Sequence, residues 1–158
     1  MDDVGRLVAI EDIKQLKARY FRCMDTKDWD GLAAVFTPDA VFDLRAVASI
    51  RDPVAGEWAP PFSGDDAVHV GRDAVMAMIR GSVERLITVH HGHMAEIEIH
   101  GETTARGVWA MEDVITSAPG EPALRMHGYG HYHETYERLA AGWAIKTTRI
   151  TRLRVDRA

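Results

Sequence analysis

The sequence predicts an α+β fold: a cone-shaped α+β barrel in which three N-terminal helices pack on a curved, mostly antiparallel sheet. Two observations predict it. Apolar side chains recur at three- and four-residue steps in the first half of the chain, and four long β-rich segments follow Leu86. Helices first and strands later favour helices gathered on one face of a sheet. The 158 residues favour a single domain over 1–158.

The first helix is expected over residues 7–26, with Lys14, Lys17 and Arg22 off its apolar stripe. The stripe consists of Ile10, Ile13, Leu16, Tyr20 and Met24. A short second helix is expected in DWDGLAAVF, with Asp28 as its N-cap, and Pro38 ends it. The segment AVFDL then reads as a short strand.

Residues 45–70 are rich in proline and glycine and show little periodicity, which predicts a long loop. Loops of this length in a compact domain usually bind ligands or act as lids. A third helix is expected over 71–86. The remaining chain reads as a meander of strands over 87–100, 103–117, 123–138 and 143–156, separated by turn signals.

Composition excludes several classes of protein. The net charge is −5 with both signs interspersed, which argues against nucleic-acid and anionic-membrane partners. The single cysteine, Cys23, rules out an intramolecular disulfide and multi-cysteine zinc sites, and we expect it to be buried. The N-terminal residues lack a signal-peptide pattern, and no apolar run approaches ~18 residues. The expected location is therefore cytoplasmic.

The segment TVHHGHMAE contains His90, His91 and His93. Strict strand alternation would place His91 and His93 on the apolar face, but Gly92 permits a bulge that would switch this parity. Parity alone does not decide which histidine faces inward. His91 and His93 are followed by Glu96, but the spacing to this glutamate is too short for a cupin-like metal site. A metal site and a polar strand with no role are the alternatives. We expect no metal and one acid–base histidine, because histidine titrates near neutral pH.

Three further segments carry polar groups at positions expected to face inward. Tyr20 lies on the apolar stripe and Asp25 follows near the helix end, so each would need a buried partner. Trp109 and Asp113 share one strand face, where a buried aspartate must be paired. The last strand offers Arg149, Arg152 and Arg154 either as partners for Asp113 or as solvated side chains. The histidines of HGYGHYHETYE read as an exposed or subunit-facing surface.

Four segments resemble the SnoaL-like branch of the nuclear transport factor 2-like superfamily, and within it the bile acid 7α-dehydratase family. They are IKQLKARYFRCMDTKDWDGLAAVF, TVHHGHMAEIEI, ARGVWAMED and GWAIKTTRITR. The stretches YFRCMD and HHGHMAEI are fairly specific, whereas GWAI is common throughout the superfamily. The loop over 45–70 departs from that family, so substrate identity is the least transferable property.

The resemblance implies a catalytic set of Tyr20, Asp25 and His90. It also implies that Asp113 and Arg149 form a second polar pair, with His93 and Trp109 near the site as substrate-binding or supporting residues. The family fold implies an apolar pocket that suits a flat hydrophobic substrate. No cofactor is implied.

The expected function is a dehydratase, a hydro-lyase that removes water from a hydroxylated carbonyl compound such as a steroid, a bile-acid-like compound or a polyketide. His90 would cycle between base and acid while Asp25 orients it and Tyr20 donates a hydrogen bond. An isomerase or cyclase with the same pocket, and a non-catalytic binding module, remain alternatives. The expected partners are a small hydrophobic substrate and further copies of the chain in a dimer or trimer, because exposed sheet edges need cover.

Overall fold

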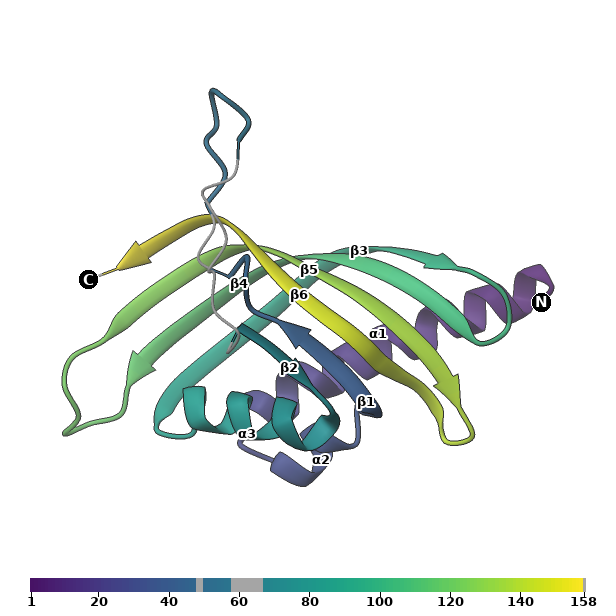
Figure 1. Ribbon diagram of the computed structural model, residues 1–158, viewed down its shortest axis with the longest axis horizontal. Helices are drawn as coiled ribbons and strands as arrows, with labels where there is room; N and C mark the ends of the chain where they lie inside the picture. Colours follow the sequence, from purple (N-terminus) through teal and green to yellow (C-terminus); the bar gives the residue numbers. More distant parts are fainter. Residues whose placement is uncertain (48–49, 58–66, 158) are drawn as a thin grey trace.

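The computed structural model describes residues 1–47, 50–57 and 67–157 (Figure 1). Three helices lie on one face of a curved six-stranded sheet: α1 (Asp3–Asp25), α2 (Trp29–Ala33) and α3 (Arg72–Val83). The strands are β1 (Phe36–Asp43), β2 (Val68–Val70), β3 (Leu86–Ile99), β4 (Thr104–Ser117), β5 (Arg125–Leu139) and β6 (Gly142–Arg157). The predicted α+β architecture is confirmed.

The strands are ordered β2-β1-β6-β5-β4-β3, and β3 to β6 form the predicted antiparallel meander. β1 pairs with β6 in parallel, and it starts earlier than expected because Pro38 is tolerated at a register irregularity between Phe36 and Val41. β2 corrects the prediction of an uninterrupted loop, since residues 68–70 pair with β1. Residues 48–49 and 58–66 of that predicted loop lie outside the described residues.

Capping side chains set the starts of α1 and α2, whereas Gly71 precedes α3 without a side-chain cap. The Asp2 carboxylate accepts a hydrogen bond from the Gly5 amide at 2.8 Å, so α1 begins four residues earlier than predicted. Asp28 caps α2 as expected, accepting from Gly31 at 2.9 Å. No helix in the described part of the chain is both long and apolar enough to cross a membrane.

The core lies between the helices and the inner face of the sheet, meaning the face toward the helices. Ile13, Leu16 and Tyr20 of α1 are almost fully buried there, and Cys23 is buried as predicted. Lys17 was expected to lie off the apolar stripe, but it is 0% exposed. The helix therefore presents a cation to the core, which requires a buried partner.

Candidate active site

The end of α1 and the first half of β3 bring Asp25 and His90 together on the inner face. Nδ1 of His90 lies 2.6 Å from Oδ1 of Asp25, and the His90 amide donates to Oδ2 at 2.8 Å. A carboxylate can only accept, so Nδ1 carries the proton and Nε2 is the basic nitrogen. Among the described residues, Nε2 has no hydrogen-bond partner. The pair can therefore take up a proton at Nε2 while Asp25 stabilises the resulting imidazolium.

Hydrogen bonds keep Asp25 ionised. Partial burial by itself would raise the pKa of this carboxyl group, but the side-chain and backbone bonds from His90 and the bond from Thr88 outweigh that effect, so the pKa lies below its usual value. The Thr88 hydroxyl donates to Oδ1 of Asp25 at 2.9 Å and itself accepts from Nζ of Lys27 at 3.0 Å. Near neutral pH the carboxylate is available to orient His90.

A β-bulge in β3 decides which histidine faces inward. The register with β4 shifts between Gly92 and Ala95, as the predicted bulge required. Upstream of the bulge His90 is 8% exposed, whereas His91 is exposed. A side chain at Gly92 would overlap the Phe21 ring, which stacks on His90 with centroids 6.2 Å apart. Glycine at this position therefore lets Phe21 support the imidazole.

The Phe21 ring separates Tyr20 from this dyad. Its ring meets Phe21 edge-on at 5.4 Å and Tyr132 at 6.0 Å between centroids. Among the described residues, no hydrogen bond joins its hydroxyl to Asp25 or His90. Complete burial, and then the nearby Tyr132 and Glu134, raise the pKa of Tyr20 well above its usual value. The phenol therefore stays protonated and can only act as a neutral donor or acceptor.

Asp113 pairs with Arg152, which corrects the prediction of Arg149. The guanidinium donates twice to the carboxylate, at 2.9 and 2.7 Å, and both side chains are buried. Asp113 is the β4 register partner of His90, so the ion pair and the dyad share the inner face. Arg149 is exposed on the outer face. The sequence held a signal for this, because Arg152 has the same strand parity as the buried Ile150.

Trp109 belongs to a buried network that sequence reasoning missed. Its indole nitrogen donates to the Tyr136 hydroxyl at 2.7 Å, and that hydroxyl donates to Glu134 at 2.6 Å. Glu134 also pairs with Lys17 at 2.6 Å, and Nζ of Lys17 lies 3.6 Å from the centroid of the Tyr132 ring. Trp109 is therefore tied to this ion pair and not to His90. Lys17 lies three residues before Tyr20, on the same helix face, which was the available signal.

The His93 side chain is exposed and does not lie on the inner face. With His91 and His127 it surrounds the Glu112 carboxylate on the outer face, at distances of 3.8, 3.3 and 3.0 Å respectively. Within 1–47, 50–57 and 67–157, no three metal-ligating side chains are arranged to hold an ion. The segment TVHHGHMAE thus divides between the two faces of the sheet.

The chain matches a known protein family over most of its length. A family model described as a SnoaL-like domain matches residues 5–149. The chain belongs to the SnoaL-like family. Among relatives of this SnoaL-like chain is "Probable cyclase FGR4" of Gibberella zeae, 23% identical over 144 residues that cover 89% of each chain.

Two solved structures share the SnoaL-like fold. One is a provisionally assigned scytalone dehydratase of Novosphingobium aromaticivorans, with a TM-score of 0.75 and 20% identity, covering 98% of this chain and 91% of that one. The other is the LinA-type3 hexachlorocyclohexane dehydrochlorinase of Novosphingobium barchaimii, with a TM-score of 0.76 and 14% identity, covering 99% and 94%. The nuclear transport factor 2-like fold predicted from the sequence is confirmed.

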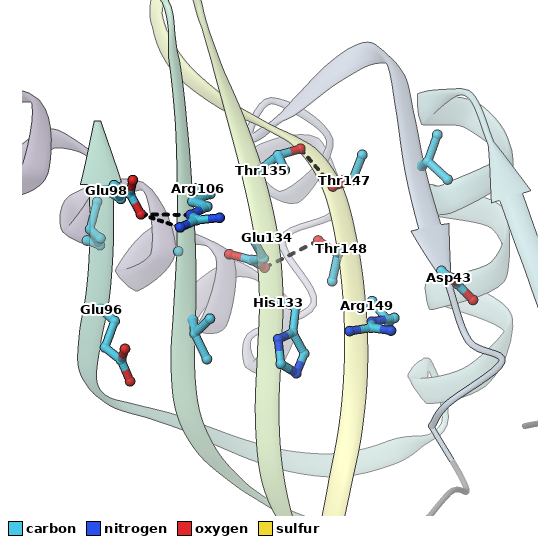
Figure 2. A pocket seen from close by; sticks show the side chains of 14 residues that line it. Asp43, Glu96, Glu98, Arg106, His133, Glu134, Thr135, Thr147, Thr148 and Arg149 are labelled. Atoms are coloured by element: carbon cyan, nitrogen blue, oxygen red, sulfur yellow. Dashed lines mark hydrogen bonds and ion pairs between the residues drawn. The ribbon is translucent and has the colours of Figure 1, made fainter. Parts of the chain in front are cut away.

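A groove of about 770 Å³ lies on the outer face of this SnoaL-like sheet (Figure 2). Glu96, Glu98 and Arg106 line one end, and Arg149 with Asp43 lines the other. The dyad lies across the sheet from this groove. Among the described residues that line the outer groove, His133 bonds to Thr151 and Glu134 pairs with Lys17, so no carboxylate there orients a histidine as Asp25 orients His90. We therefore assign the candidate active site to the inner face.

Proposed function

We propose that this SnoaL-like protein is a cofactor-independent dehydratase acting on a hydrophobic hydroxylated carbonyl compound, such as a steroid, a bile-acid-like compound or a polyketide. The observation that carries the proposal is the dyad, in which Asp25 holds Nδ1–H of His90 at 2.6 Å and leaves Nε2 free among the described residues. This is the arrangement that a general base near neutral pH requires.

The reaction begins with proton removal. Nε2 of His90 takes the proton from a carbon that the substrate carbonyl has made acidic, and the electron pair moves into the carbonyl to form an enolate. The Asp25 carboxylate stabilises the imidazolium through Nδ1–H. A protonated Tyr20 supplies a hydrogen bond to oxygen, where negative charge develops. Reaching that oxygen requires the substrate to lie against the ring of Tyr20.

Loss of water completes the cycle. The enolate electrons return to form a carbon–carbon double bond as the carbon–hydroxyl bond breaks. The His90 imidazolium gives its proton to the departing hydroxide, so water leaves and His90 is neutral again. The Asp113–Arg152 pair, facing the same side as His90, would fix the polar end of the substrate or the local field.

The names of similar proteins support an elimination or a related reaction, since they describe a cyclase, a dehydratase and a dehydrochlorinase. A cyclase or isomerase would use the same enolate but lose no water, and the similarity to a probable cyclase favours keeping this second candidate. A binding-only role is less well supported, because a passive pocket has no need for an oriented histidine–carboxylate pair.

Mass spectrometry of products from a panel of hydroxylated 3-oxo steroids and polyketide ketones tests the proposal. We expect a product lighter by one water, and His90→Ala should lower kcat by roughly 10²–10⁴-fold. His100→Ala, an exposed histidine just beyond β3, is the matched control and should keep full activity. Products of unchanged mass would indicate isomerisation or cyclisation, and full activity of His90→Ala would exclude the proposed base.

A further inference from the structure

Lys27 has a backbone conformation that its residue type disfavours. Its φ is 61°, and it is the sole non-glycine residue with positive φ among those described. The Asp28 amide bonds to the Cys23 carbonyl at 2.9 Å and the Lys27 amide to Met24 at 3.3 Å. These two bonds form a Schellman motif, in which the left-handed position is usually glycine. Here the position holds a lysine, whose side chain takes no part in these two backbone bonds.

The Lys27 side chain connects to the dyad through one hydroxyl. Its ammonium donates to Oγ1 of Thr88 at 3.0 Å, Thr88 donates to Oδ1 of Asp25 at 2.9 Å, and that same oxygen lies 2.6 Å from Nδ1 of His90. An ammonium group has only donors. Because the Thr88 oxygen accepts from Lys27, its single proton is directed to Asp25. Lys27 thereby fixes the direction of a bond that keeps Asp25 in place.

Burial favours the same role. Thr88 is 4% exposed, so its hydroxyl has little access to water as an alternative partner. Partial burial lowers the pKa of Lys27, and the attraction of Asp25 opposes this effect. The Thr88 hydroxyl thus lies between the Lys27 ammonium and the Asp25 carboxylate and bonds to both.

We propose that Lys27 is a positioning residue, held in a strained backbone conformation because its ammonium orients Thr88 toward Asp25 and so aligns His90. Strained residues persist where the surroundings hold them, and such sites cluster near active sites. The catalytic part of this inference rests on the proposed function. The structural part, alignment of the dyad, does not require a substrate.

Lys27→Gly separates strain from function. Glycine removes the penalty of positive φ, so Tm should rise. Loss of the ammonium should lower kcat by about 10–100-fold, the range seen when a residue that orients a metal-bound histidine is removed. Thr88→Val should lower kcat similarly without raising Tm. Lys27→Arg keeps the donors and should retain most of the activity. Lys14→Met removes an exposed charge from α1 and should change neither kcat nor Tm.

A readout without substrate is the downfield ¹H NMR signal of the His90 Nδ1–H, assigned by its absence in His90→Ala. We expect this signal to move upfield and broaden in Lys27→Gly and Thr88→Val but not in Lys14→Met. A shifted signal in a protein that turns nothing over would support the positioning role and count against the proposed function. An unchanged signal with unchanged kcat, or a lower Tm in Lys27→Gly, would overturn the inference.

Discussion

Arg149 and Arg152 lie on the same strand, β6, but their side chains point to opposite faces of the sheet. Arg152 follows the buried Ile150 by two residues and faces the core, where its guanidinium binds Asp113 through two hydrogen bonds. A side chain at Gly128 would overlap both partners, so the neighbouring strand leaves room for the pair. Removing one member of a buried ion pair leaves the other charge without compensation.

We therefore expect Arg152→Met to lower the free energy of unfolding by about 3–5 kcal/mol. Arg149→Met, which removes the same charge from the outer face, should change it by no more than about 0.5 kcal/mol. Urea denaturation at neutral pH measures both. Equal effects of the two substitutions would contradict the pairing.

The inward positions of Tyr20, Asp25 and His90 follow from local patterns in the sequence, with one exception that matters. The helical stripe placed Tyr20, but strand alternation favoured His91 over His90. The bulge that reverses this depends on Phe21 from α1 packing against Gly92, which is a contact between segments far apart in the chain. Arg149 was selected by motif likeness where strand parity would have selected Arg152.

At the scale of elements, α1 contributes more than an apolar stripe. It carries Lys17 into the core, where Glu134 of β5 is its partner and the rings of Tyr20 and Tyr132 lie under the ammonium. Helical periodicity placed the apolar side chains of α1 correctly but put Lys17 outside them. It could not give the pairing with Glu134, because that partner lies on a strand whose register is fixed by its neighbours. The short helix α2 was predictable, since Asp28 and its cap are local.

The Lys17–Glu134 pair predicts how stability varies with pH. Burial lowers the pKa of Lys17 from 10.5 to about 8, although Glu134 opposes the shift. Between these two values the unfolded chain binds more protons than the folded one, so this group makes the free energy of unfolding rise with pH. The contribution is unfavourable below about pH 8 and disappears above 10.5.

Urea denaturation across this pH window should show that slope in the wild type and a smaller one in Lys17→Met/Glu134→Gln. The double variant is the appropriate comparison, because Lys17→Met alone leaves Glu134 buried without its cation and should destabilise by about 3–5 kcal/mol. Identical slopes in the wild type and the double variant would show that Lys17 does not titrate in this window.

For the whole molecule, none of the helices in the described part of the chain covers the outer face of the sheet. All three helices lie on the inner face, and the outer face carries the groove of about 770 Å³ (Figure 2). Periodicity predicted this layering, whereas parallel pairing of β1 with β6 had no local signal. In the cross-strand register, Val108 of β4 and His133 of β5 lie between Glu96 of β3 and Arg149 of β6. Partial burial lowers the pKa of His133, which favours its neutral form. A neutral centre with a charged rim is the usual composition of a protein interface.

We therefore expect the chain to form a homo-oligomer, a dimer or trimer, that covers this outer face. Because Glu96 and Arg149 lie at opposite ends of this row of register partners, a second copy in reversed orientation would place Glu96 of each chain near Arg149 of the other. Light scattering during size-exclusion chromatography should give a mass above that of one chain. Val108→Arg would place a charge at the neutral centre and should shift the mass toward a monomer, whereas Lys14→Glu on α1 should not. A monomeric wild type over a wide range of concentrations, or an oligomer unaffected by Val108→Arg, would exclude this face as the interface.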